Sequence, residues 1–267
     1  MSWSRRTLLT AAALAPLLLA ACGSSSGTAK TGSGAAGGSS APALSGSITV
    51  LAAASLTGSF TMLGKQFESA HPGTKVTFSF GASSALAQQI TSGAPVDVFA
   101  SASSKNMTAV VTAGDAADPK TFANNVAEIA VAPASAGKVT GLADLARPGV
   151  KVALCQPEVP CGALAQKVLV KAKVMLTPVT RGLDVKAVLA TVSSGEVDAG
   201  IVYVTDVKAA GAAVTGVTIP TDANASTAYP IATVKTSKNA GLAQAFEDYV
   251  LSADGQGVLT QAGFAKP

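Results

Sequence analysis

The chain has 267 residues, of which 48% are hydrophobic, 13% charged and 4% aromatic. That length allows one large α/β domain or two lobes of ordinary size, each able to bury a core. A single histidine excludes a His-rich zinc or di-metal centre, and the scarcity of aromatic residues argues against a surface that stacks nucleic-acid bases. The formal net charge is +4, but from Gly46 onward 16 Lys and Arg stand against 15 Asp and Glu, so we expect no nucleic-acid partner.

Residues 1–21 have the pattern of a bacterial signal peptide. An arginine pair precedes an apolar run of about 14 residues, which is short for a membrane span. The run ends in the sequence LAAC, the lipobox pattern in which the cysteine, here Cys22, is diacylated and becomes the first residue. The arginine pair is compatible with export by either the Sec or the twin-arginine route.

Residues 22–45 are dominated by Gly, Ser and Ala and show no apolar periodicity. Such a segment cannot offset the entropy of ordering by burying apolar surface, so we expect a flexible tether. A lipid anchor followed by a tether predicts that the remaining chain is held at the cell membrane, on its extracytoplasmic face and close to a membrane partner.

From Ser47 onward, strand and helix periodicities alternate. Apolar residues at positions 56, 60, 63 and 67 predict an amphipathic helix. Strands are predicted at Ser47–Ala53, Lys75–Phe80, Val96–Ala100, Val126–Val131, Val150–Leu154 and Ala199–Val204. Helices are predicted at Leu56–Ala70, Ala85–Ser92, Ala163–Ala172, Val185–Ser193 and Gly241–Leu251. This alternation predicts the α/β class with a mostly parallel sheet.

Cys155 and Cys161 are the two cysteines that follow the lipobox. An oxidising compartment outside the cytoplasm permits a disulfide between them, which would contribute about 2 kcal/mol by closing a small loop. Their spacing does not fit a zinc knuckle, and neither a histidine nor a third cysteine lies nearby. We therefore predict a disulfide.

Ligands of open parallel sheets bind beyond the carboxyl ends of the strands. Four predicted strand-to-helix junctions are built of small or hydroxyl residues and expose helix N-terminal N–H groups, which suit an anion. They are Ala53-Ala54-Ser55, Gly81-Ala82-Ser83-Ser84, Pro160-Cys161-Gly162 and Leu183-Asp184-Val185, and Tyr203 lies near the end of a further strand. Arg181 and Lys186 flank the fourth junction, and the others lack cations. Neutral N–H and O–H donors would therefore hold a compact, fully ionised oxyanion.

Each of these residues also has an ordinary structural interpretation. Ser55 and Ser83 alone are typical helix N-caps, Tyr203 alone is typical of a half-buried strand, and Cys161 is structural through its sulfur. The recurrence of the same chemistry at corresponding junctions favours a ligand site.

Six motifs follow one another in a fixed order along the chain. They are AAASLT from Ala52, FGASSALAQQI from Phe80, GAPVDVFASA from Gly93, VPCG from Val159, LDV from Leu183 and GIVY from Gly200. In their order and intervals these motifs resemble the molybdate-binding proteins of ABC importers. The resemblance extends from about Ser47 to the end of the chain, including Gly263-Phe264.

The resemblance implies a type II periplasmic-binding-protein fold, an α/β architecture of two lobes joined by two crossing segments around a ligand cleft. Residues 46–126 and 230–267 would form lobe 1, and residues 127–229 lobe 2. It implies high-affinity binding of molybdate and of tungstate, two anions that a single sequence does not distinguish. The protein would act as a monomer, without a cofactor and without enzymatic activity. Hinge closure would present the anion to an ABC permease. The ATPase would be a separate subunit, because this chain lacks GxxxxGK[ST].

The resemblance also implies a set of ligand contacts. Ser55 and Ser83 would each use a hydroxyl and an N–H group, Cys161 and Val185 their backbone N–H groups alone, and Tyr203 its hydroxyl. Cys161 stands where the family often has Ala, a departure that a backbone donor tolerates. Ala82 stands where the family often has Ser. No residue would bind the metal atom directly.

Three other functions compete with this interpretation. The first is a secreted hydrolase, which would need a nucleophile motif. GxSxG is absent from Gly46 onward, the one histidine precedes Pro72, and a single S-x-x-K at Ser135–Lys138 is a chance match.

The second competing function is a binding protein for sulfate, phosphate or an amino acid. An amino-acid binder usually needs an arginine that binds the carboxylate with two hydrogen bonds and an acid for the amine. Arg147 and Arg181 are the only arginines after the leader, and Arg147 precedes Pro148 in a predicted surface loop. A phosphate site would profit from an acceptor for the remaining proton, and the junctions offer Asp184 at most. A structural or adhesive lipoprotein is the third, and the repeated junction chemistry argues against it.

Overall fold

The computed structural model describes residues 44–267. The predicted signal peptide, the predicted lipidation site Cys22 and nearly all of the predicted tether lie outside the described residues. None of the helices in the described part of the chain has the length and apolar character needed to cross a membrane.

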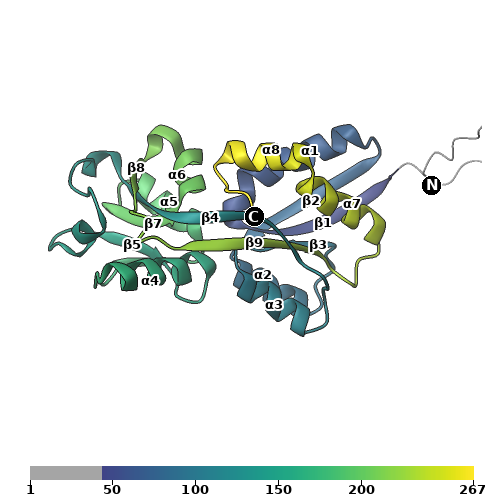
Figure 1. Cartoon of the computed structure of the whole chain (residues 1–267), viewed down its shortest axis with the longest axis horizontal. Helices are drawn as coiled ribbons and strands as arrows, with labels where there is room; N and C mark the ends of the chain where they lie inside the picture. Colours follow the sequence, from purple (N-terminus) through teal and green to yellow (C-terminus); the bar gives the residue numbers. More distant parts are fainter. Residues whose placement is uncertain (1–43) are drawn as a thin grey trace, which may run out of the picture. The chain divides into compact units, whose positions relative to one another are not determined.

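Lobe 1 is built on three parallel strands. β1 (Gly46–Ala53) lies between β2 (Thr74–Gly81) and β3 (Val98–Ala100). The helices of lobe 1 are α1 (Thr57–Ala70), α2 (Ser83–Thr91), α3 (Ser104–Thr112), α7 (Ala240–Leu251) and α8 (Ala253–Ala262). A short 3-10 turn, η1 (Ala54–Leu56), links β1 to α1. The helices α1, α7 and α8 cover one face of these strands, and α2 and α3 cover the other (Figure 1).

The alternation of side chains along β1 supplies both cores of lobe 1. Val50 points to the face of α1 and α7, whereas Leu51 points to the face of α2 and α3. On the first face, Phe60 and Phe67 of α1 pack against Phe246 of α7, with ring centroids 6.2 and 5.4 Å apart. All three rings are fully buried, which confirms the apolar helix face predicted from the sequence.

Lobe 2 repeats this arrangement around one core. β5 (Val152–Cys155) runs parallel to β6 (Thr180–Gly182) and β7 (Ala199–Tyr203). Its helices are α4 (Pro160–Ala172), α5 (Val185–Ser193) and α6 (Val204–Ala210), with short 3-10 turns at Pro133–Ser135, Leu142–Ala146 and Gly211–Ala213. Buried aliphatic side chains of α4 and α5 pack on β5 and β7.

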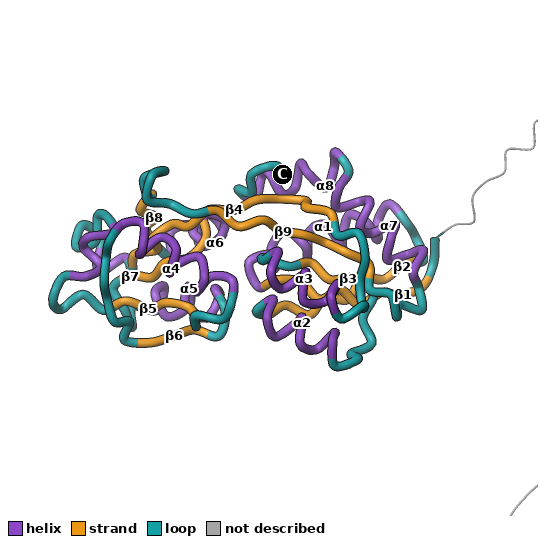
Figure 2. Tube along the Cα trace, turned by 60° about the horizontal axis from the view of Figure 1, so that its bottom comes forward, coloured by secondary structure: helices purple, strands orange, loops and turns teal. Residues whose placement is uncertain are grey.

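Two long strands run between the lobes (Figure 2). β4 (Lys120–Val131) and β9 (Ser226–Thr233) pair antiparallel with one another as far as Val126. From Ala127 onward β4 pairs instead with β7 and with the edge strand β8 (Thr215–Thr218), while β9 pairs with β3. The strand order β2-β1-β3-β9-β4-β7-β5-β6 thus joins two α/β lobes by two crossing segments, as predicted.

The predicted parallel character of the sheet is only half right. The strand pairs within each lobe core are parallel, but every pair that involves β4 or β9 is antiparallel. The reason is topological, because a strand that returns from one lobe to the other enters the sheet against the direction of its neighbours.

Asp198 ties together three segments at the base of lobe 2. One carboxylate oxygen accepts hydrogen bonds from Ser135 Oγ and Lys138 Nζ at 2.6 and 2.8 Å, and the other accepts from the Lys151 N–H at 2.7 Å. Burial alone would raise the pKa of Asp198, but these hydrogen bonds outweigh it and lower the pKa to about 2. The S-x-x-K pair therefore serves a structural carboxylate.

Asp198→Asn is expected to lower the free energy of unfolding at pH 7 by about 1–3 kcal/mol, because the hydrogen bonds to the charge are lost. Since the pKa in the folded protein lies below the ordinary value of 3.8, the stabilisation is present above that value and disappears as the pH falls toward about 2. Urea unfolding at several pH values measures this, with the exposed Asp222→Asn as control. A deficit of the same size at pH 7 and pH 2 would contradict the assignment.

Candidate functional site

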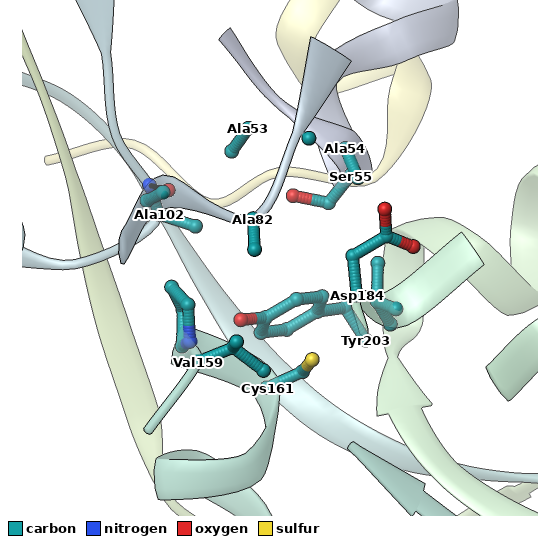
Figure 3. Close-up of a pocket in the computed structure, with 13 residues that line it drawn as sticks. Ala53, Ala54, Ser55, Ala82, Ala102, Val159, Cys161, Asp184 and Tyr203 are labelled. Atoms are coloured by element: carbon teal, nitrogen blue, oxygen red, sulfur yellow. Dashed lines mark hydrogen bonds between the residues drawn. The ribbon is translucent and has the colours of Figure 1, made fainter. Parts of the chain in front are cut away.

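A small cavity lies where the two lobes face each other, at the ends of β1, β2 and β7 and the first turns of α2, α4 and α5 (Figure 3). The cavity and its opening to solvent together hold about 220 Å³ of space free of atoms. All five residues predicted to contact a ligand line it: Ser55, Ser83, Cys161, Val185 and Tyr203. The other lining residues are Ala53, Ala54, Gly81, Ala82, Ala102, Val159, Pro160 and Asp184. The structure thus brings together residues that are up to about 150 positions apart in the sequence.

Three helices begin at this cavity. The helix α2 starts at Ser83 and α4 at Pro160, earlier than the predicted starts at Ala85 and Ala163, whereas α5 starts at Val185 as predicted. Pro160 is suited to a first helical position because it has no N–H group to satisfy. The N–H groups of Ser83, Cys161 and Val185 therefore lie in first turns, where the helix offers no acceptor and the helix dipole is positive.

Two serine hydroxyls face the cavity from lobe 1, and both are buried. Ser83 Oγ accepts a hydrogen bond from the Ala102 N–H at 2.9 Å. Ser55 Oγ lies 2.9 Å from the hydroxyl of Tyr229, a residue of the crossing strand β9. Each serine thus has one partner in the protein and keeps hydrogen-bonding capacity for a ligand.

Tyr203 contributes a third hydroxyl from lobe 2, which Figure 3 shows pointing into the cavity. The side chain is buried, and no polar atom of the described residues forms a hydrogen bond with its hydroxyl. Burial, together with the nearby Tyr229 hydroxyl, raises the pKa of Tyr203 well above its ordinary value of 10, so the group is a neutral donor at neutral pH. A buried hydroxyl without a partner costs about 1–3 kcal/mol, so this donor is available to a ligand.

None of the cavity-lining residues is Lys, Arg or His. The nearest buried charge is Asp206, which forms an ion pair with Lys186 at 2.8 Å and accepts a hydrogen bond from the Tyr203 N–H at 3.3 Å. Asp184 is the one acidic residue in the lining, and its Oδ1 caps α5 by accepting from the Ala187 N–H at 2.9 Å. An anion in this cavity would therefore be held by neutral donors.

The predicted disulfide between Cys155 and Cys161 is confirmed, with the two Cα atoms 5.8 Å apart. It ties the end of β5 to the first turn of α4, and so braces the backbone that carries the Cys161 N–H. The next residue, Gly162, packs so closely that a Cβ atom there would lie 1.8 Å from the Gln156 carbonyl oxygen. Both features fix the position of this helix start.

Two residues behind the cavity were missed by sequence reasoning. Tyr229 on β9 and Asn125 on β4 are both buried, and Asn125 donates from Nδ2 to Thr205 Oγ1 at 2.8 Å. The sequence carried little signal for Asn125, because it is one of several polar residues in its strand. The role of both residues depends on contacts between distant segments, which a local pattern does not report.

Comparison with known proteins gives a consistent picture. A family model described as "Bacterial extracellular solute-binding protein" matches residues 48–265. The molybdate-binding protein ModA of Mycobacterium tuberculosis is 43% identical, over 83% of this chain and 85% of the relative.

Two solved structures share the fold at lower identity. The periplasmic molybdate-binding protein of Azotobacter vinelandii has a TM-score of 0.72 at 21% identity, covering 82% of this chain and 99% of that one. The sulfate-binding protein SubI of Mycobacterium tuberculosis has a TM-score of 0.71 at 22% identity, covering 82% and 86%. At these identities the likeness supports the two-lobed fold and does not distinguish the ligand.

The two buried tyrosines give a test of the site without any ligand. Tyr203→Phe is expected to leave the free energy of unfolding of the ligand-free protein unchanged or to raise it by about 1 kcal/mol, because it removes an unpartnered hydroxyl. Tyr229→Phe is expected to lower it by about 1–2 kcal/mol, because that hydroxyl is hydrogen-bonded. Urea unfolding measures both, and equal destabilisation by the two variants would show that the Tyr203 hydroxyl has a protein partner.

Proposed function

Because this chain belongs to the family of bacterial extracellular solute-binding proteins, we propose that it binds molybdate outside the cytoplasmic membrane and delivers it to an ABC permease. The observation that carries the proposal is the cavity between the lobes, which gathers neutral donors and contains no cationic side chain. The name of the relative that is 43% identical supports the choice of anion. Tungstate has the same charge and shape and nearly the same size, so it is included in the proposal.

Molybdate is a tetrahedral dianion that carries no proton at neutral pH, so its oxygens only accept hydrogen bonds. In the proposed complex, Ser55, Ser83 and Tyr203 donate from their hydroxyls, while Cys161 and Val185 donate from their N–H groups. The three helix N-termini disperse the negative charge without a counter-ion. Hydrogen bonds of this kind are stronger in a closed cavity than in water, because the local dielectric constant is lower.

Hinge closure follows from the division of these donors between the lobes. Ser55 and Ser83 belong to lobe 1, whereas Cys161, Val185 and Tyr203 belong to lobe 2, so each lobe alone offers part of the shell. An anion that contacts both lobes stabilises the closed form and shifts the population toward it. We place the bend where β4 exchanges β9 for β7, between Val126 and Ala127, and at the corresponding part of β9. The lobe limits at 126/127 and 229/230 remain part of this proposal.

The closed form would then dock on a permease whose ATPase is a separate subunit. The lipobox at Cys22 supports anchoring to the outer face of the membrane by a lipid, with residues 22–45 as the tether. We assign the protein no cofactor and no catalytic step, and we expect it to act as a monomer.

Ser55→Ala and Ser83→Ala are each expected to weaken molybdate binding by about 1–3 kcal/mol, since each leaves an anion oxygen without a donor in a closed site. Calorimetric titration of the purified protein measures the change. Ser92→Ala, at the exposed end of α2, is the matched control and is expected to bind as tightly as the wild type. Full affinity in both cavity variants would refute the site.

A further inference from the structure

We propose that Asn125 and Tyr229, on the two crossing strands, fix the direction of the Ser55 hydroxyl so that its proton is available to the ligand. The inference rests on the proposed function and names two positioning residues for the same site. Neither side chain lines the cavity.

The contact between Ser55 and Tyr229 is ambiguous when taken alone. The two hydroxyl oxygens lie 2.9 Å apart, and either can donate. Each hydroxyl carries one proton, so the choice has a consequence in the cavity. If Ser55 donates to Tyr229, it presents lone pairs to the ligand and repels an anion. If Ser55 accepts from Tyr229, its own proton is available to the anion.

Asn125 resolves this ambiguity. The Val126 N–H donates to Asn125 Oδ1 at 3.0 Å, which identifies the oxygen side of the amide. The other side, Nδ2, faces both Thr205 Oγ1 at 2.8 Å and the Tyr229 hydroxyl at 3.5 Å. An amide nitrogen only donates, so the Tyr229 hydroxyl accepts there and sends its proton to Ser55, the acceptor that the described residues place within hydrogen-bond distance. The order is Asn125 to Tyr229 to Ser55 to ligand.

The other two hydroxyls of the cavity have the same polarity. Ser83 Oγ accepts from a backbone N–H, that of Ala102, which cannot act in the reverse direction. The Tyr203 hydroxyl has no acceptor among the described residues and is free to donate into the cavity. All three hydroxyls can therefore donate inward. The acid in the lining, Asp184, accepts one hydrogen bond through Oδ1 and keeps further acceptor capacity.

This polarity determines how the anion is bound. A fully ionised anion such as molybdate only accepts hydrogen bonds, so it satisfies each donor that points into the cavity. If the Ser55 proton pointed to Tyr229 instead, one anion oxygen would face a lone pair and lose its donor, which weakens binding.

Reversal of the chain of hydrogen bonds is the sharpest test. In Asn125→Asp, assayed at pH 8 to keep the new carboxylate ionised, Tyr229 would donate to that carboxylate and accept from Ser55, so that lone pairs face the anion. Molybdate affinity is expected to fall about 100-fold, against about tenfold for Tyr229→Phe. The double variant, which has no hydroxyl to reverse, is expected to bind about tenfold better than Asn125→Asp alone.

Calorimetric titration with sodium molybdate measures these affinities, and thermal unfolding checks that each variant is folded. Tyr249→Phe, which removes a hydroxyl bonded only to Gln66 of α1, is the control. If Asn125→Asp fails to fold, Tyr229→Phe decides by itself, because it removes the group that orients the Ser55 proton and must weaken molybdate binding about tenfold.

The outcomes separate the two proposals. The hydrogen-bond chain alone would be overturned, with a wild type that binds molybdate, by either of two results. One is that the affinity losses of the single variants add in the double variant, and the other is that Tyr229→Phe binds molybdate as tightly as the wild type. A wild type that gives no heat with molybdate would overturn the proposed function and this inference with it.

Discussion

Hydrogen-bond donors buried without acceptors are costly, and this structure gathers them where its two lobes meet. The cavity receives the first turns of three helices and three hydroxyl groups, while cationic side chains are absent from its lining. Much of the surrounding architecture serves to hold these donors in place. The Cys155–Cys161 disulfide fixes the start of α4, and the Asp206–Lys186 ion pair holds the backbone of Tyr203 beside the start of α5. In the proposed complex, a ligand that only accepts hydrogen bonds would offset the cost of burying these donors.

The crossing strands connect this chemistry to the motion of the lobes. β4 and β9 form the only sheet pairing shared by both lobes in the described part of the chain, and they also carry Asn125 and Tyr229. Asn125 donates to Thr205 in lobe 2, and Tyr229 contacts Ser55 in lobe 1. The same pair of strands therefore connects the two lobes and, in our proposal, orients the Ser55 hydroxyl in the site.

Local patterns in the sequence predicted most of the structural features that depend on residues close together in the chain. The apolar period of α1, the strand β1 and the small residues at the four junctions were all recognisable, because each reflects burial or capping within a few residues. The short strands β6 and β8 and the polar helix α3 were not predicted, since few of their residues are buried. The antiparallel pairing of β9 and the contact of Tyr229 with Ser55 join segments far apart in the chain, 174 residues in the case of the two hydroxyls, and no local pattern reports them. The ligand itself was inferred from resemblance to a family and not from periodicity.

The most direct test of the central claim is calorimetric titration of the wild-type protein with molybdate, tungstate, sulfate and phosphate at neutral pH. The arrangement of donors and the kinship with a molybdate-binding protein predict tight one-to-one binding of molybdate and tungstate, with little heat from sulfate or phosphate. Sulfate is also a proton-free dianion, so its rejection would show that the cavity selects by size as well as by charge. Tight binding of phosphate in preference to molybdate, or no heat from any of the four anions, would contradict the assignment of this cavity to molybdate.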